Sequence, residues 1–379
     1  MKILITGSNG FIGKNLAETL KSIKSGKDKT RDIVIDEVYL YDLNSSSDDL
    51  DTYTKDCDYV VNLAGINRPE KPEEFYQGNK GFIETLCSYL AKNKNKCPII
   101  ASSSIQVGKD NDYAKSKKEG EDCLKGFSQN NGNPIYIYRF ANLFGKWCRP
   151  NYNSVTATWC HNIANHLDIQ VNDPKVILPL CYIDDVVTEL IECMKGNANF
   201  NGEYYEVSPV YQVSLESLAN TLYSFKESKK DLSIPDQGND FIRKLYATYL
   251  SYLPENEFSY PLKMNIDDRG SFTEFIRTEA HGQVSVNISK PGITKGNHWH
   301  HTKNEKFLVV SGTGIIRFRR IGDNQVIEYH VSGAKLEVID IPTGYTHNIE
   351  NLGDTDMVTI MWANEPFDPD KPDTYFEEV

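Results

Sequence analysis

Four side chains of types that bind metal ions lie in two separated stretches of the C-terminal half of the chain. His298 and His300 are two positions apart and Glu305 follows them, whereas His347 belongs to a later stretch. Side chains at positions i and i+2 of a strand point to the same face, so the other two residues can join the first two from neighbouring strands of a small barrel. Three imidazoles and one carboxylate suit zinc or another borderline divalent cation and leave a position for water or substrate. The spacing therefore predicts a metal site with these four ligands.

The residues around these ligands predict a barrel. The combined pattern resembles the two-part signature of the cupin family, which here consists of Gly292, His298, His300, Glu305 and Gly312, then Pro342, Gly344, His347 and Asn351. The resemblance implies an all-β cupin (jelly-roll) barrel. His301 points to the opposite face from its neighbours and is left out of the ligand set. The alternative is a histidine-rich edge strand whose imidazoles are merely solvated.

A second site is predicted at the start of the chain. Residues 2–6 are an apolar run typical of a buried strand, and a run of glycines leads from it into a helical pattern over residues 14–24. This order is typical of a dinucleotide-binding loop, because glycines allow close approach of the backbone and the helix N-terminus faces the pyrophosphate. The next predicted strand ends at Asp42, which can accept both ribose hydroxyls of NAD and would repel a 2′-phosphate; the alternative is a plain aspartate between strand and loop. The predicted cofactor contacts here are Gly7, Asn9, Gly10, Phe11, Ile12, Gly13 and Asp42.

Two tyrosines are followed by a lysine four positions later. Tyr113 and Lys117 come after a strand that ends in three serines, on a predicted helix whose positions i and i+4 share a face. There Lys117 can lower the pKa of Tyr113 and hold the nicotinamide ribose, while a serine hydroxyl orients a substrate carbonyl. Tyr76 and Lys80 precede that strand and are predicted to form a solvated helix face.

Strand and helix patterns alternate through the first half of the chain, which predicts a doubly wound parallel sheet. Over roughly residues 1–245 the chain resembles the extended short-chain dehydrogenase/reductase family, in residues 6–13, 63–65, 79, 102–104, 113–117, 139–145 and 182–186. The resemblance implies a Rossmann-type fold and substrates that are nucleotide-activated sugars. It also implies Ser104 as the catalytic hydroxyl, with Ser103 as the alternative, together with Tyr113 and Lys117. Further cofactor contacts are expected from Leu63, Ala64, Gly65 and Asn79, and substrate contacts from Arg68 and Asn142.

Length, charge and cysteine use set the outer limits. The 379 residues suffice for two domains, and a net charge of −12 argues against nucleic acid as a partner. No apolar run is long enough to span a bilayer, and the eight scattered cysteines favour reduced thiols in the cytoplasm.

Pro254 and Pro261 bracket a short connection, so we predict an NAD(P)-binding reductase domain over residues 1–252 and a metal-binding cupin epimerase domain over residues 253–379.

One more motif of the second domain bears on function. Residues 267–274 resemble the opening motif of the cupin-class nucleotide-sugar 3,5-epimerases. Those epimerases are metal-free and use a histidine as base, but the corresponding histidine falls near His298, which is predicted to bind metal. The candidates for proton transfer are therefore Lys295, Lys303 and Tyr345, and Lys295 is also a predicted substrate contact.

The whole chain closely resembles the CapF family of bifunctional capsular polysaccharide synthesis enzymes, with further matches in residues 146–154 and 283–312. The resemblance implies that the cupin, with zinc, epimerises C3 of a UDP-linked 4-keto-6-deoxy-2-acetamido sugar. The reductase domain would then reduce the C4 ketone with NADPH, giving a 6-deoxy-L-talose-type amino sugar on the route to UDP-L-FucNAc. A homodimer is also implied. Because Asp42 favours NADH, both NADPH and NADH stay open.

Two other functions remain open at this point. In the first, the chain is a nucleotide-sugar 4-ketoreductase whose cupin serves only as a structural or dimerisation module. In the second, it is a non-catalytic nucleotide-sugar sensor that holds NAD(H) as a structural group. The epimerase-like motif argues against the first function, and the complete Ser104, Tyr113 and Lys117 set argues against the second.

Overall fold

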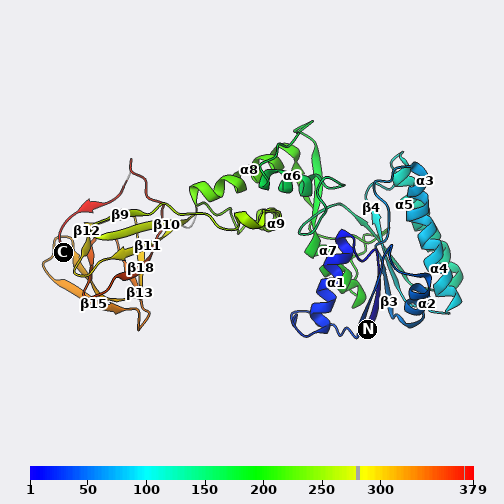
Figure 1. Ribbon diagram of the computed structural model, residues 1–379, viewed down its shortest axis with the longest axis horizontal. Coiled ribbons are helices and arrows are strands. Elements are labelled where there is room, and N and C mark those ends of the chain that lie inside the picture. Colours follow the sequence, from blue (N-terminus) through cyan, green and yellow to red (C-terminus); the bar gives the residue numbers. More distant parts are fainter. Residues whose placement is uncertain (279–281, 371) are drawn as a thin grey trace. The chain divides into compact units, whose positions relative to one another are not determined.

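The computed structural model describes residues 1–278, 282–370 and 372–379, which form two compact units (Figure 1). The first unit comprises Met1–Tyr223 and Lys244–Pro254, and the second comprises Ser224–Arg243 and Glu255–Val379. The predicted boundary between residues 252 and 253 lies two residues before the second unit resumes. The segment Ser224–Arg243, which falls inside the predicted first domain, packs with the second unit instead.

The first unit is built on a five-stranded sheet with the order β2-β1-β3-β4-β5, in which every neighbouring pair is parallel. The chain leaves β1 for one neighbour and then returns to its other side, so the strand order reverses at β1. Ligands of such sheets bind beyond the carboxyl ends of the strands at this reversal. The predicted doubly wound, Rossmann-type sheet is confirmed. Its strands are Lys2–Thr6 (β1), Glu37–Tyr41 (β2), Tyr59–Asn62 (β3), Ile99–Ser104 (β4) and Ile135–Phe140 (β5).

Helices cover both faces of this sheet, and each face has its own apolar core. Ile3 and Ile5 of β1 belong to one core, which α1 (Phe11–Lys24) and α7 (Ile183–Met194) complete. Leu4, which points to the opposite face, belongs to the other core. Figure 1 shows α1 and α7 on one side of the sheet and the second group of helices on the other. That group consists of α2 (Ser47–Asp56), α4 (Phe82–Lys92) and α5 (Asp112–Asn131).

The helix that follows the loop after β3 is interrupted. It consists of α3 (Pro72–Tyr76), a π-helical turn η1 (Gln77–Gly81) and α4. At Gly78 the helix passes so close to the loop after β3 that a Cβ would lie 2.5 Å from the side chain of Ile66. The widened turn allows this contact and buries Asn79, which is 2% exposed.

The remaining elements of the first unit follow β5 in the sequence. A three-stranded sheet has the order β6-β7-β8, with β6 (Asn142–Phe144) parallel and β8 (Tyr211–Ser214) antiparallel to β7 (Ile177–Tyr182). Helix α6 (Val155–Ala164) follows β6 in the chain. Helices α8 (Leu215–Asp231) and α9 (Asp240–Leu250) each contribute residues to both units.

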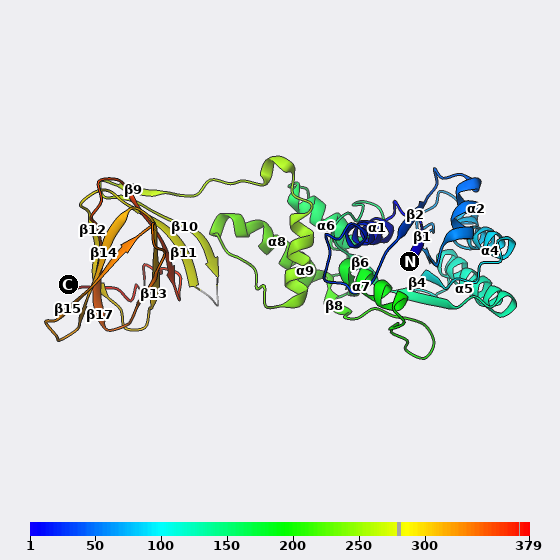
Figure 2. The same ribbon diagram turned by 90° about the horizontal axis from the view of Figure 1, so that it is seen from below.

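The second unit is a barrel of two antiparallel sheets (Figure 2), and the predicted cupin jelly roll is confirmed. One sheet has the order β16-β13-β18-β11-β10-β9 and the other β15-β14-β17-β12-β19, and a short 3₁₀ turn η2 (Glu255–Glu257) precedes them. Phe307, Ile316, Phe318, Ile349 and Met357 pack between the sheets. The strands are Asn265–Asp267 (β9), Gly270–Thr278 (β10), Gly282–Ser289 (β11), Thr294–Trp299 (β12), Glu305–Ser311 (β13), Thr313–Arg320 (β14), Val326–Ser332 (β15), Val338–Ile341 (β16), Tyr345–Asn351 (β17), Met357–Ala363 (β18) and Tyr375–Phe376 (β19).

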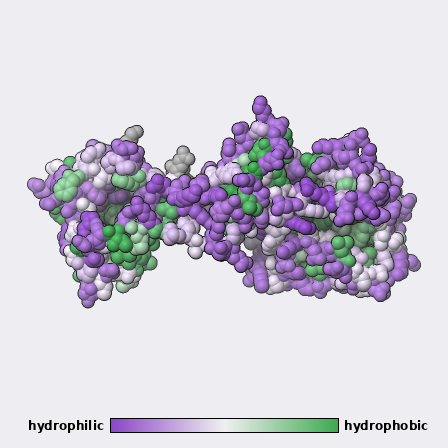
Figure 3. All heavy atoms as spheres, turned by 45° about the horizontal axis from the view of Figure 1, so that its top comes forward, coloured by the Kyte–Doolittle hydropathy of each residue, from purple (hydrophilic) through white to green (hydrophobic). Residues whose placement is uncertain are grey.

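The surface carries hydrophobic residues in separate patches. Figure 3 shows these patches in green among mostly hydrophilic residues on the visible face. Among the helices that the structure describes, none combines the length and the apolar character needed to cross a bilayer.

Candidate functional site

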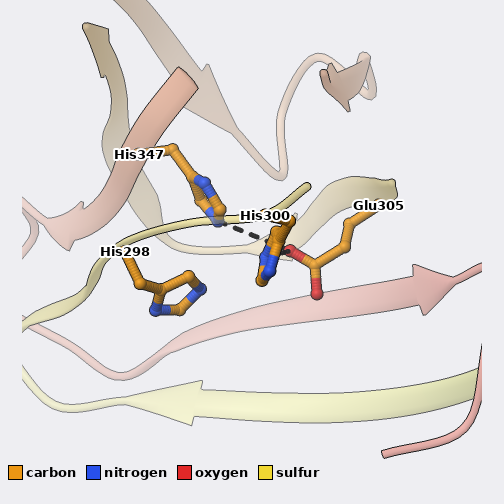
Figure 4. A group of neighbouring side chains, drawn as sticks. All are labelled: His298, His300, Glu305 and His347. Carbon is orange, nitrogen blue, oxygen red and sulfur yellow. Dashed lines mark ion pairs between the residues drawn. The ribbon is translucent and has the colours of Figure 1, made fainter. Parts of the chain in front are cut away.

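The four predicted metal ligands converge inside the barrel. His298 lies on β12 directly opposite His347 on β17, His300 follows the end of β12, and Glu305 is the first residue of β13. One donor atom of each residue lies within 4.8 Å of the donor atoms of the other three. Figure 4 shows the four side chains pointing toward one another.

A bulge in β12 re-aims the first ligands. The pairing with β17 shifts between Gly296 and His298, and the intervening Asn297 has a positive φ of 56°. The sequence predicted a regular strand with His298 and His300 on one face. In the structure the two side chains also lie together, but a bulge precedes His298, and His300 follows the end of the strand. His301 lies outside the cluster, with its ring 4.4 Å from that of Trp299.

The buried donor atoms fit a divalent cation. The Nε2 atoms of His300 and His347 lie 3.3 and 3.4 Å from Oε2 of Glu305, and none of these three atoms has a hydrogen-bond partner among the described residues. Burial and the neighbouring imidazoles lower the pKa of His298 to about 4, which keeps it neutral. Burial would raise the pKa of Glu305, but the imidazoles of His300 and His347 hold it below its usual value. Neutral imidazoles and one ionised carboxylate are the donors that zinc binds.

An open cavity of about 640 Å³ leads to this cluster. One part of its wall is polar and includes Lys295 and Asn287, and another part is apolar. A ligand with both a polar ring and an apolar substituent would therefore find matching surfaces. The apolar lining residues include Met264, Ile266, Phe272, Phe307, Ile349 and Met361.

The structure separates the three candidates for proton transfer. The ammonium group of Lys295 lines the cavity and donates to Oδ1 of Asn287 and to the carbonyl of Ile288, each at 2.8 Å. Burial lowers its pKa from the ordinary lysine value. Lys303 is buried and donates to Oγ1 of Thr374 at 2.9 Å. Neither Lys303 nor Tyr345 is among the described residues that line the cavity.

In the first unit, the predicted dinucleotide loop connects β1 to α1. Gly7 has a φ of +67°, and a Cβ at this position would lie 2.7 Å from the backbone of Ala64. A Cβ at Gly13 would lie 2.2 Å from the carbonyl oxygen of Gly7. The loop therefore requires glycine at both positions, and it leads directly into the N-terminus of α1, where a pyrophosphate could bind. Between these glycines lie Asn9, Gly10, Phe11 and Ile12. The loop after β3 begins with Leu63, Ala64 and Gly65, and its first two residues lie against Gly7.

Asp42 lies beside this loop. Its Oδ2 accepts a hydrogen bond from the amide of Asn9 at 2.7 Å, and its Oδ1 accepts one from the amide of Leu43 at 2.8 Å. The fixed carboxylate would receive ribose hydroxyls and repel a 2′-phosphate.

We expect Asp42→Ala to change the choice of cofactor. Without the carboxylate, the ratio of kcat/KM for NADPH to kcat/KM for NADH should rise about tenfold, which corresponds to roughly 1.4 kcal/mol of removed repulsion. Steady-state ketone reduction with each cofactor measures this ratio. Asp48→Ala, at an exposed position of α2, is the control. An unchanged ratio would show that Asp42 does not contact the ribose.

Tyr113 and Lys117 lie one turn apart on α5, next to the end of β4. Burial raises the pKa of Tyr113, and a hydrogen bond with the hydroxyl of Ser104 partly offsets that rise. Burial lowers the pKa of Lys117 to about 8. The neighbouring serine hydroxyl, that of Ser103, donates instead to Glu121 at 2.6 Å. This geometry favours Ser104 over Ser103 as the hydroxyl that works with the tyrosine.

The second Tyr-x-x-x-Lys pair is arranged differently. The hydroxyl of Tyr76 donates to Asp112 at 3.3 Å, and the ammonium group of Lys80 lies 3.2 Å from Glu119. Both groups pair with acidic residues of α5 at the surface.

Asn79 connects the loop after β3 to α5. Its Oδ1 accepts from the amide of Ile66 at 3.0 Å, and its Nδ2 donates to the hydroxyl of Ser116 at 3.0 Å. A Cβ at Gly65 would lie 3.0 Å from Nζ of Lys117, so the loop packs directly on the lysine. Asn79 thus holds this contact in place.

The predicted substrate contacts lie in both units. Arg68 is exposed in the loop after β3, and Asn142 is exposed on β6, where it donates to the carbonyl of Pro179 at 3.2 Å. Lys295 lies in the cavity of the second unit.

Two residues that contact the predicted sites were not found from the sequence. Glu121, one turn after Lys117, forms a bidentate ion pair with Arg139, at 2.9 and 2.8 Å. Asp373 binds the loop between two of the metal ligands. The i, i+4 spacing of Lys117 and Glu121 could have indicated the first, but no local pattern indicates the second.

Comparisons with known proteins agree with this architecture. Residues 3–208 match the NAD dependent epimerase/dehydratase family, and residues 265–375 match the polysaccharide biosynthesis C-terminal domain. The chain is 43% identical to a UDP-2-acetamido-2,6-beta-L-arabino-hexul-4-ose reductase of Pseudomonas aeruginosa, over 99% of this chain and 98% of that protein.

Solved structures give the same result. The crystal structure of the capsular polysaccharide assembling protein CapF of Staphylococcus aureus is 54% identical, with a TM-score of 0.92 and complete coverage of both chains. A UDP-glucuronic acid 4-epimerase of Bacillus cereus in complex with NAD is 18% identical, covers 66% of this chain and 96% of that one, and has a TM-score of 0.53. The latter similarity concerns the fold alone.

Proposed function

Because this chain belongs to the CapF family, and its residues 3–208 to the NAD-dependent epimerase/dehydratase family, we propose that it is a bifunctional enzyme of UDP-linked keto sugars. The barrel epimerises C3 of a UDP-4-keto-6-deoxy-2-acetamido-hexose. The first unit then reduces the C4 ketone, which gives a 6-deoxy-L-talose-type amino sugar on the route to UDP-L-FucNAc for capsular polysaccharide. One observation carries the proposal: a single chain holds a Tyr–Lys pair near the glycine loop after β1 and a cluster of His298, His300, Glu305 and His347, three of which line an open cavity.

The order of the two reactions follows from their chemistry. The proton on C3 is acidic only while C4 is a ketone, because the carbonyl delocalises the charge that deprotonation leaves. Epimerisation must therefore precede reduction, and reduction fixes the new configuration. A divalent cation held by His298, His300, Glu305 and His347 would supply electrostatic stabilisation of the charge that develops on the C4 oxygen.

Within the cavity, Lys295 as the neutral amine would remove the C3 proton, and a proton from solvent in the open cavity would be delivered to the opposite face of the ring, which inverts C3. It is the lysine that lines the cavity with the ligand cluster, and burial already lowers its pKa, so that less free energy is needed to form the neutral amine. Hydrogen bonds to Asn287 and to the carbonyl of Ile288 fix the position of its amino group in the cavity wall.

In the first unit, Ser104 and Tyr113 would bind the C4 oxygen, and Tyr113 would donate its proton as the ketone becomes an alcohol. The nicotinamide supplies the hydride. Lys117, while protonated, lowers the cost of the negative charge that remains on the tyrosine oxygen. On the geometry of Asp42 we propose NADH as the preferred cofactor, with NADPH as the alternative.

We also propose a compartment and an oligomeric state. All eight cysteines are free thiols, and seven of them are buried, which supports a reducing compartment such as the cytoplasm. A homodimer is proposed on the family resemblance alone.

Deuterium exchange tests the epimerase proposal. The protein is incubated in D₂O with the UDP-4-keto-6-deoxy amino sugar and without nicotinamide, and NMR follows the C3 proton. We expect exchange with the natural chain and a loss of about 10²–10⁴-fold in Lys295→Met, because a positioned proton-transfer group contributes about that factor. Lys306→Met is the control, since Lys306 pairs with Asp340 at the surface.

The outcomes separate the proposal from its rivals. Exchange by the natural chain that survives in Lys295→Met would assign proton transfer to another group. No exchange until NADH or NADPH is added would support a ketoreductase with a structural barrel. Tight sugar binding without any turnover would support a sensor.

A further inference from the structure

The C-terminal segment of the chain holds the loop that separates two of the metal ligands. After His300 the chain passes through residues 301–304 before it reaches Glu305. Oδ1 of Asp373 accepts a hydrogen bond from the amide of His301 at 3.0 Å. Its Oδ2 accepts from the amides of Thr302 and Lys303, both at 2.9 Å, and from the hydroxyl of Thr302 at 2.9 Å. One carboxylate thus satisfies four donors of a single short loop.

The same residue fixes the orientation and the tautomer of His300. Nδ1 of His300 lies 2.6 Å from the main-chain carbonyl oxygen of Asp373. A carbonyl oxygen can only accept, so Nδ1 must carry the hydrogen. The lone pair of the neutral ring is therefore on Nε2, which faces the cluster at 3.3 Å from Glu305. The residue accordingly sets both the orientation and the tautomer of His300.

Neighbouring residues of the segment hold the other ligand strands. β19 pairs with β12, where Phe376 lies opposite His298. The amide of Glu377 donates to the carbonyl of Asn297 at 3.0 Å, and its carbonyl accepts from the hydroxyl of Thr346, next to His347. Residues 372–377 therefore contact His298, His300 and the neighbour of His347, and they hold the loop that leads to Glu305.

From these contacts we propose that Asp373 is the positioning residue of the metal centre. Its carboxylate fixes the path of the chain from His300 to Glu305, and its carbonyl orients His300, so that the ligands are already placed when the cation binds. The inference rests on the proposed metal site and adds a residue that lies outside the four-ligand set. Residues that orient metal ligands in this way contribute about 10- to 100-fold to metal affinity.

Zinc affinity of the full-length chain tests the proposal. The cation is removed with a chelator, and Zn²⁺ is titrated back in competition with a chromophoric chelator. We expect Asp373→Ala to bind Zn²⁺ about 10- to 100-fold more weakly than the natural chain. Asp373→Asn, which keeps one acceptor oxygen but presents an amide group to the remaining donors, should fall between them. Asp370→Asn, an exposed position of the same segment, should leave the affinity unchanged.

A measurement without metal separates positioning from folding. Hydrogen exchange of the Thr302 and Lys303 amides in the metal-free protein should be slow in the natural chain and fast in Asp373→Ala, while amides of the barrel strands remain protected in both. Zinc affinity of Asp373→Ala within twofold of the natural value would overturn the proposal. If the natural chain itself bound no zinc, the proposed metal site would fail first, and this inference with it.

Discussion

Replacing His298 with alanine is expected to abolish deuterium incorporation at C3 of the 4-keto sugar. The variant loses one of the four candidate donor groups that lie within 4.8 Å of one another. The cation would be bound more weakly and the developing charge on the C4 oxygen would lose its stabilisation, so the exchange rate should fall about a thousandfold or more. NMR in D₂O without nicotinamide measures the rate, and the zinc content of the same sample is determined in parallel.

His301→Ala is the matched control for this variant. It removes an imidazole three positions away whose ring packs against Trp299 outside the cluster. It should retain both zinc and exchange. Exchange that persists in a zinc-free His298→Ala sample would contradict a metal-dependent epimerase, whereas loss in both variants would indicate general damage to the barrel.

Replacing Tyr113 with phenylalanine should stop the second reaction and spare the first. The variant lacks the hydroxyl that bonds to Ser104 and is proposed to protonate the C4 oxygen. We expect kcat for ketone reduction to fall about 10²–10⁴-fold, while exchange at C3 stays at the natural rate. Nicotinamide absorbance follows the reduction. Tyr76→Phe, in the other Tyr-x-x-x-Lys pair, should be unaffected.

The pH dependence of reduction provides a second readout of the same site. Lys117 has a pKa of about 8, against an ordinary value of 10.5, so it is charged below pH 8 and loses its proton as the pH rises through that value. The kcat/KM for reduction should therefore decline above about pH 8. A flat profile up to pH 10 would contradict an active role for the charged form of Lys117.

Both architectures were predictable because the patterns that carry them are local. The apolar strand, the glycine loop and Asp42 all lie within the first 42 residues. The parallel sheet was predicted from the alternation of strand and helix patterns along the first half of the chain. The cluster of His298, His300, Glu305 and His347 was predictable for a related reason, since the first three lie within one short stretch of the sequence. His347 was found because the turn before it carries its own glycine and proline.

What could not be predicted depends on contacts between distant segments. Asp373 reaches the loop after His300 from far along the chain, through a segment with little regular structure, and no periodicity marks it. Lys295 could be separated from Lys303 only when the wall of the cavity was known, because both lie near the ligands in sequence. The packing of Ser224–Arg243 with the second unit likewise depends on its tertiary contacts, and the composition of the segment does not indicate it.

The π-helical turn at Gln77–Gly81 has a consequence for comparing sequences. Such a turn contains one residue more than the α-helical turn that it replaces, so a homologue with one residue fewer could run through this region as an unbroken helix. Because each residue of an α-helix rotates the side chain by about 100°, such a deletion would carry the Asn79 amide away from Ile66 and Ser116. A one-residue gap in an alignment at this place would thus mark a change in how the loop after β3 is held against α5, although neither Tyr113 nor Lys117 had changed.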